Sequence, residues 1–205
     1  MPDSETPGVI EFLVPGDPEQ NTGGYRYVRK LVEALNERGQ NARVAGLPGR
    51  FPRPDERASR ALDRHLAGMP DGTCVVLDGL AMGGLPEILE KHHKRLSLLA
   101  LVHHPLADET GLSEAEAAWF YTAEKRALAL VSGIVTTSRH TAARLVDYGV
   151  PAGAGRVAEP GVAMPASAEP PEKPFTEDDV PHLLCVAHLS PRKAQHQLVE
   201  ALQSL

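Results

Sequence analysis

The sequence has few of the features that mark disulfide-bonded, membrane-spanning or nucleic-acid-binding proteins. Its two cysteines, Cys74 and Cys185, each lie in an apolar run, which predicts buried free thiols rather than a disulfide. No apolar run approaches the roughly 20 residues of a membrane span, and the opening stretch MPDSETPG has no signal-peptide pattern. The net charge of −6 leaves no basic excess for nucleic acid. We therefore expect a cytoplasmic protein with neither a membrane span nor a nucleic-acid partner.

The sequence also lacks the short signatures of metal and dinucleotide sites. Its 9 histidines show no metal-ligand spacing with carboxylates, so no metal and no bound cofactor are expected. The dinucleotide fingerprint G-x-G-x-x-G is missing, and so is the Gly-Lys-Ser/Thr of a P-loop. A nucleotide-dependent oxidoreductase is therefore a weak hypothesis.

What the sequence does contain is an alternation of apolar strands with amphipathic helices. This pattern predicts an α/β fold with a doubly wound parallel sheet, Rossmann-like, that binds ligands at the carboxyl ends of its strands. Ser113 with Glu116 forms a capping box that opens a helix to about residue 131, Ser138 can cap the next helix, and Gly149 ends it. Strands are expected at 8–14, 42–47, 74–79, 96–104 and 133–138, with a short one within 155–162.

Composition predicts where this domain ends. The stretch from Met164 to Pro181 is rich in proline and acidic residues, which is typical of a linker. Beyond it a new strand, 182–189, and a new helix, 194–205, are expected. We thus predict a first domain at 1–165, a linker at 166–181, and the opening of a truncated second domain at 182–205.

A glycine pair, Gly23 and Gly24, follows the first expected strand where a helix begins. Glycine lets backbone approach a ligand, and a helix N-terminus offers unpaired N–H groups to an anion, so a phosphate or a sugar suits this place. The alternative is a loop that needs glycine at positive φ.

Two histidines, His103 and His104, end the most apolar strand. A histidine at this position can bind a hydroxyl or move a proton at neutral pH, or it can simply bond to backbone. Strand alternation puts the two on opposite faces. By contrast, His92 and His93 lie on a polar helix face and are expected to be solvated.

Basic residues mark two further places. Arg139 follows the capping residue Ser138 and is free to meet a ligand, while Arg192 and Lys193 lie at the start of the last helix. Cations beside a helix N-terminus favour a diphosphate, although an exposed basic turn explains them as well.

Taken together, these segments resemble a GT-B glycosyltransferase of the GT4 type. The matching pieces are the Gly23-Gly24 loop, LVHHPL, GIVTTSRHTAARLVDYGV, RVAEPGV and LLCVAHLSPRKAQHQLVEAL, and the resemblance extends over essentially the whole chain. The last two are similar to the family's V-x-x-N-G-V-D turn and to its G-R-L-x-x-x-K-G opening of the donor domain.

The resemblance implies sugar transfer from a nucleotide-diphospho-sugar, as co-substrate, to an acceptor hydroxyl between two Rossmann-like domains. It places Gly23, Gly24, Arg192 and Lys193 at the donor phosphates and His103 in the catalytic cleft. It leaves Tyr25, His104, Ser138 and Arg139 as candidate acceptor or sugar contacts.

The sequence also departs from the family pattern. His188 stands where arginine is common, Ala194 replaces the glycine after the lysine, and Glu159-Pro160-Gly161 replaces Pro-Asn-Gly. The family's E-x7-E segment would lie beyond Leu205, so the fragment is expected to be inactive alone. The alternative is a stand-alone Rossmann-like binding or regulatory module without catalysis. Peripheral membrane contact, and a homodimer through the last strand and helix, stay open.

Overall fold

The computed structural model describes residues 8–162, 183–187, 189 and 191–203. The chain divides into two compact units, residues 1–160 and 161–205. The expected linker at 166–181 lies outside the described residues, as do the opening stretch 1–7 and the positions of His188 and Ser190.

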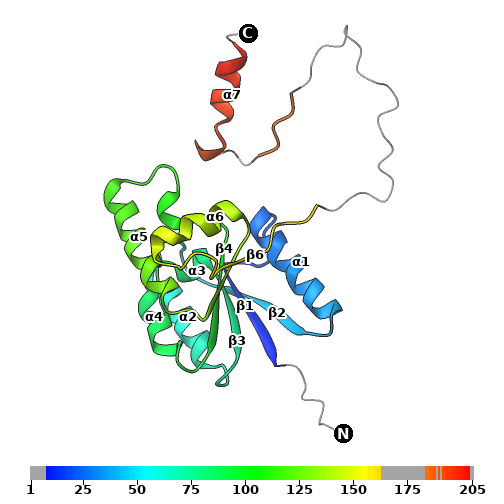
Figure 1. The fold of residues 1–205 in the computed structure, drawn as a ribbon, viewed down its shortest axis with the longest axis vertical. Coiled ribbons are helices and arrows are strands. Elements are labelled where there is room, and N and C mark those ends of the chain that lie inside the picture. The colour runs from blue at the N-terminus through cyan, green and yellow to red at the C-terminus, as the bar shows by residue number, and fades with distance from the viewer. Residues whose placement is uncertain (1–7, 163–182, 188, 190, 204–205) are drawn as a thin grey trace. The chain divides into compact units, whose positions relative to one another are not determined.

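The first unit is built on a six-stranded sheet in which every neighbouring pair of strands is parallel, in the order β2-β1-β3-β4-β5-β6. The sheet runs through the centre of the unit in Figure 1. Its central strands are apolar because they are buried on both faces. The strands are β1 (Val9–Pro15), β2 (Asn41–Leu47), β3 (Cys74–Asp78), β4 (Ser97–Val102), β5 (Gly133–Thr136) and β6 (Arg156–Val157).

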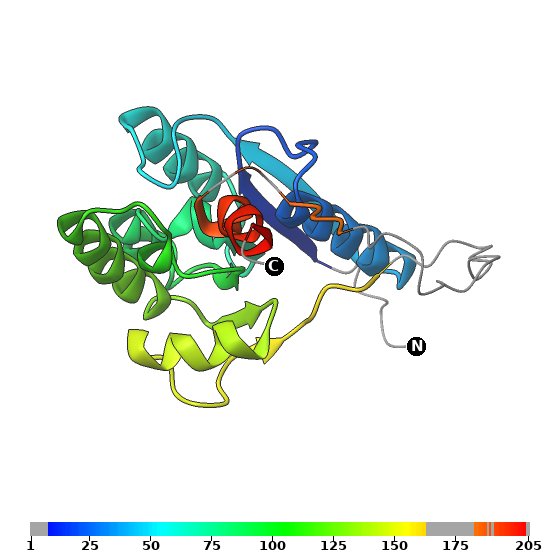
Figure 2. The ribbon, with the colours of Figure 1, turned by 90° about the horizontal axis from the view of Figure 1, so that it is seen from above.

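Helices cover both faces of the sheet, so the prediction of a doubly wound α/β fold is confirmed. One core cluster joins α2, α4 and α5 to the sheet, and a second joins α1 to the opposite face. Figure 2 shows α1 and α2 on opposite sides of β1 and β2. The helices of this unit are α1 (Gly23–Glu37), α2 (Glu56–Ala67), α3 (Gly79–Met82), α4 (Pro86–His92), α5 (Glu114–Leu128) and α6 (Arg139–Arg144), with 3₁₀ turns η1 (Leu106–Asp108) and η2 (Leu145–Tyr148).

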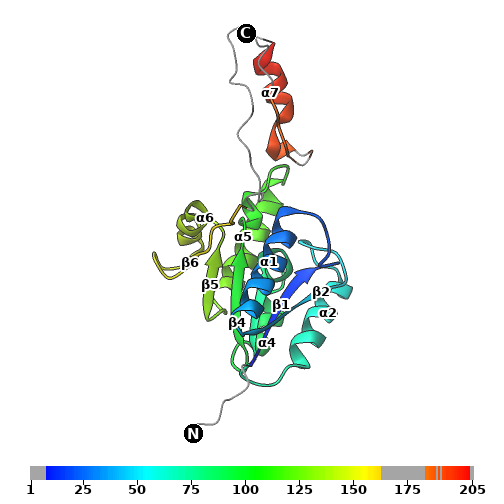
Figure 3. The same ribbon diagram turned by 90° about the vertical axis from the view of Figure 1, so that its right-hand side faces the viewer.

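The strand order fixes where a ligand is expected. The chain passes from β1 outward to β2, then returns across β1 to place β3 on its other side. The direction of winding therefore reverses between β1 and β3. Figure 3 shows β2 beside β1. Ligands of open α/β sheets bind beyond the carboxyl ends of the strands at such a switch point.

The predicted helix ends are confirmed at three positions. Ser113 and Glu116 form both bonds of the capping box at the start of α5, and Ser138 caps α6 by accepting a bond from the Thr141 N–H at 3.0 Å. Gly149 ends η2 at φ 86°, in the left-handed region that favours glycine.

The prediction of solvated histidines on α4 is wrong for His92. Its side chain is buried, and its Nε2 lies 2.8 Å from Asp63 Oδ1 on α2. The Arg95 guanidinium contacts the other ring nitrogen at 3.2 Å. Because α2 packs against α4, a residue that appears polar in sequence bonds across the helix interface.

Two predictions for the second unit are also wrong. Residues 183–187 have no regular secondary structure instead of forming a strand, because the described part of this unit offers no neighbouring strand to pair with. Cys185 is accordingly exposed, and Cys74 is only half-buried; both thiols are free. The expected helix does form, as α7 (Gln195–Leu202), after the 3₁₀ turn η3 (Pro191–Lys193).

Candidate functional site

Gly23 and Gly24 are the first two residues of α1, and neither has positive φ. The alternative reading, a loop that needs glycine at positive φ, is therefore wrong. The N-cap residue Thr22 makes no side-chain hydrogen bond to the helix, and the first turn holds no acidic residue. The first N–H groups of α1 thus have no side-chain cap, and the positive end of the helix dipole is not neutralised.

Packing does not explain both glycines either. A methyl group added at Gly23 would meet no described atom within 4 Å, while one at Gly24 would lie 3.7 Å from His103 Nε2, an ordinary contact. Where the backbone conformation suits alanine, a glycine costs a protein about 0.4–1 kcal/mol relative to alanine. Gly23 thus lowers stability at a position that faces open space. Open space at the backbone is what close approach of a ligand requires.

His103 directly follows β4 and lies over the start of α1. Its Nε2 is buried and makes no hydrogen bond to any described residue. A buried polar atom without a partner costs about 1–3 kcal/mol, so such an atom needs a reason. The Thr141 hydroxyl on α6 donates to the His103 carbonyl at 3.2 Å, which ties the backbone of His103 to the next helix.

Asp78 ends β3 and faces His103. Its Oδ2 lies 3.7 Å from His103 Nε2, too far for a hydrogen bond, while its Oδ1 accepts from the Leu80 N–H at 2.8 Å and caps α3. The Asp78 side chain is 8% exposed. Gly23, Gly24, Tyr27, Asp78 and His103 together form what we call the switch-point cluster.

Burial controls the protonation of this cluster. Burial raises the pKa of Asp78 to about 6, and it lowers the pKa of His103. Both shifts favour the neutral forms, so desolvation outweighs the attraction that a charged pair at 3.7 Å would supply. Near neutral pH a carboxylate therefore faces a neutral imidazole, an arrangement that can hold a hydroxyl group and accept its proton.

Two tyrosines of α1 support this arrangement. Tyr27 packs edge-on against the His103 ring, with ring centroids 5.6 Å apart, and its hydroxyl donates to the Ala158 carbonyl at 2.8 Å. The Tyr25 hydroxyl, predicted as a sugar contact, donates to the Pro15 carbonyl at 2.6 Å. Tyr25 therefore holds the end of β1 to α1, next to the glycines.

The other candidates of the first unit lie apart from the cluster. His104 faces Asp108 and has a buried Nε2 without a hydrogen bond to a described residue. Ser138 is occupied as the cap of α6. The Arg139 side chain is 90% exposed and lies 3.8 Å from Glu159. The structure thus brings together Gly23, Gly24, Tyr25 and His103, but not these three.

Lys193 belongs to the second unit, where it ends η3, and Arg192 precedes it. Their predicted contact with a diphosphate stays a prediction. Ala194, for which the resemblance led us to expect glycine, adopts φ 52°, a left-handed conformation that costs a non-glycine residue about 1–2 kcal/mol. The backbone after Lys193 therefore has a conformation that glycine would favour.

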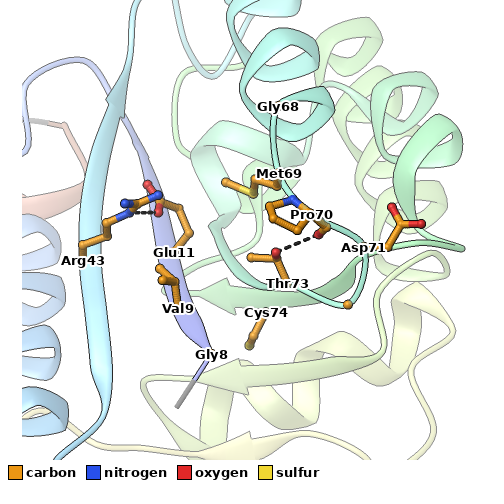
Figure 4. A pocket seen from close by; sticks show the side chains of 11 residues that line it. Gly8, Val9, Glu11, Arg43, Gly68, Met69, Pro70, Asp71, Thr73 and Cys74 are labelled. Atoms are coloured by element: carbon orange, nitrogen blue, oxygen red, sulfur yellow. Dashed lines mark hydrogen bonds and ion pairs between the residues drawn. The ribbon is translucent and has the colours of Figure 1, made fainter. Parts of the chain in front are cut away.

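A large cavity lies at the other end of the sheet. It has a volume of about 710 Å³ and is lined by residues around the amino ends of β1 and β3 (Figure 4). Its polar groups already have partners, because Glu11 pairs with Arg43 and His65 while the Thr73 hydroxyl donates to the Pro70 carbonyl. These groups of the cavity are therefore less available to bind a ligand than the unpartnered His103 Nε2 of the switch-point cluster.

Sequence reasoning missed Asp78 and Tyr27. A signal was present for Asp78, because it is a carboxylate that ends an apolar strand at the edge of the sheet where ligands bind. No comparable signal identified Tyr27, which lies between helix positions that face the core. Its contact with His103 depends on how α1 crosses the sheet.

Two comparisons with known proteins do not assign this site. No protein-family model matches the chain, and a search of curated proteins finds no match. Among the described residues, no helix is long and apolar enough to cross a membrane. The same residues contain no group of three or more His, Cys, Asp or Glu side chains that could hold a metal ion.

Proposed function

We propose that the switch-point cluster binds a nucleotide-diphospho-sugar and an acceptor hydroxyl, and that this chain supplies the acceptor-side domain of a glycosyltransferase of the GT-B type. The observation that carries the proposal is the meeting of an uncapped helix start, a half-buried imidazole whose Nε2 is buried without a hydrogen-bond partner, and a buried carboxylate. All three lie at the carboxyl edge of the sheet, beside the switch point.

Each group has a distinct task in this proposal. The free N–H groups at Gly23 and Gly24 would bind the diphosphate, because the helix dipole and the absent Cβ atoms favour an anion at that place. The acceptor hydroxyl would bond to His103 Nε2, which then gains the partner it lacks. Asp78, ionised above about pH 6, would favour proton transfer from that hydroxyl as it attacks the sugar.

Turnover would need groups beyond the cluster. The described residues of the second unit contain no strand, so they do not form a second Rossmann-like domain by themselves. A donor held from one side only is not positioned for attack, and positioning supplies much of the rate enhancement. We therefore expect this chain alone to bind a nucleoside diphosphate while transferring or hydrolysing little nucleotide-sugar.

Gly23→Ala tests the proposal because it moves stability and binding in opposite directions. In urea denaturation the variant should gain about 0.5–1 kcal/mol, since alanine loses less backbone entropy than glycine in a helix. In calorimetric titration with UDP or GDP it should lose at least about tenfold in affinity, the effect of one lost charge-assisted bond.

Gly8→Ala is the matched control, because a methyl group there also meets open space but lies at the amino end of β1. It should leave nucleotide affinity unchanged. The proposal fails if wild-type protein binds neither nucleotide, or if Gly23→Ala binds as tightly as wild type.

A further inference from the structure

A second feature of the carboxyl edge is the single tryptophan of the chain, Trp119, on the second turn of α5. Its side chain is 47% exposed in a sequence with few aromatic residues. The neighbouring Phe120 is buried and packs edge-on against the indole, with ring centroids 4.9 Å apart. The indole is therefore a supported, solvent-facing aromatic surface.

Charged groups lie directly beside this indole. A hollow of about 310 Å³ is lined by Trp119, Phe120, Ala115, Arg53 and Glu116. Arg53 and Glu116 form an ion pair across it, and their side chains are 59% and 35% exposed. Both side chains are therefore partly accessible to a ligand.

The charged pair is held in place from both sides. The Glu116 carboxylate accepts from the N–H and the hydroxyl of Ser113, at 2.8 and 2.9 Å, through the capping box of α5. The segment around Arg53 packs closely on Gly84, where a methyl group would lie 2.9 Å from the Pro52 carbonyl. The aromatic surface and the charged pair are thus pre-positioned, which lowers the cost of binding.

The size of the feature indicates a small molecule. A protein interface needs about 800 Å² from each partner, whereas the other exposed large apolar side chains described in the first unit, Leu80, Val146 and Val157, lie on other elements. Val146 and Val157 line a separate hollow that contains neither Trp119 nor Arg53. A volume of about 310 Å³ lies at the lower end of ligand pockets.

The chemistry of the lining narrows the ligand further. A sugar ring presents C–H groups on one face, which an indole can cover, and hydroxyl groups on its rim, which both a guanidinium and a carboxylate can bond. Glu114 and Glu116 in the first turn of α5 place negative charge there, which disfavours a phosphate-bearing ligand.

We propose that the hollow beside Trp119 is a subsite for a neutral sugar ring of the acceptor, so that the acceptor is a glycan or glycoside. The assignment of the bound sugar as the acceptor rests on the proposed function. Sugar binding in the hollow does not require that function. Both the hollow and the switch-point cluster are reached from the carboxyl edge, because Arg53 follows β2 and α5 follows β4.

The single tryptophan makes the test direct. Titration with maltotriose, mannotriose and galactotriose should give a saturable change in tryptophan emission for at least one of them. Arg53→Ala should weaken that sugar by about tenfold, the loss of a bond to a charged group. Arg57→Ala, which removes an exposed arginine on α2, should leave the affinity unchanged.

Calorimetry of Trp119→Ala completes the test, because removal of a half-exposed side chain leaves the fold intact, as circular dichroism can verify. This variant should bind no sugar but should bind UDP or GDP like wild type. The subsite is refuted if no trisaccharide changes the tryptophan emission, or if only a nucleotide changes it. It is also refuted if the emission depends on protein concentration alone, or if Trp119→Ala still binds sugar. Nucleotide binding without sugar binding would refute the subsite and leave the proposed function standing.

Discussion

Glu124 gives the sharpest prediction about stability, because the folded chain buries it on the apolar side of α5. Its side chain is 1% exposed, and its Oε2 accepts from the Leu106 N–H at 2.9 Å. Its Oε1 is buried without a hydrogen bond to a described residue. Burial, with a smaller contribution from Asp108, raises the pKa of Glu124 to about 8.

The sign of the effect follows from where the proton is held. The folded state keeps the Glu124 proton up to about pH 8, while the unfolded chain releases it near the ordinary glutamate pKa of 4.5. Between these values the folded state binds more protons, so stability falls as pH rises, by about 1.4 kcal/mol per pH unit and about 5 kcal/mol in total. Glu124→Gln cannot ionise, and its carbonyl can still accept from Leu106.

Urea denaturation between pH 6.5 and pH 8 measures this difference, with Glu37→Gln, an exposed helix position, as the control. Over that interval Glu124→Gln should gain about 2 kcal/mol relative to wild type. His103 does not disturb the comparison, because both proteins contain it and its contribution to the pH dependence cancels. Parallel pH curves for wild type and Glu124→Gln would refute the buried, protonated carboxyl.

Two further substitutions test the packing around the site. Arg144→Ala removes two 2.7 Å bonds to Asp108 and should lower the free energy of unfolding in urea by about 1.5–3 kcal/mol. Arg57→Ala, the control, should change it little. Equal effects of the two substitutions would contradict the assigned contacts. Leu77→Ala empties a fully buried position in β3 beside Asp78 and should cost about 2–5 kcal/mol. A loss below 1 kcal/mol, on the order of a surface change, would contradict that burial.

Much of the fold could be predicted from the sequence, because apolar periodicity and helix-capping residues act locally. Ser113, Ser138 and Gly149 mark helix ends in the structure as they do in the sequence. The strand expected at 182–189 is not formed by residues 183–187, although the run is apolar. An apolar run becomes a strand only when a neighbour supplies hydrogen bonds, and local sequence does not contain that information.

The candidate site could be predicted only in part, for a similar reason. Gly24 and His103 are far apart in sequence, yet both were expected at the carboxyl edge, and a methyl group added at Gly24 would lie 3.7 Å from His103 Nε2. The separation of His103 from Asp78 depends on the register of β3 and β4, in which Asp78 pairs with Leu101. Glu124 was missed although its spacing from Phe120 and Leu128 puts it among buried positions of α5.

The most direct test of the central claim is an NMR titration of isotopically labelled protein with UDP or GDP. If the switch-point cluster binds the diphosphate, the amide signals of Gly23 and Gly24 and the imidazole signals of His103 should shift together and saturate at one concentration. Shifts confined to the cavity around Glu11 and Cys74, or no saturable shift at all, would contradict the account.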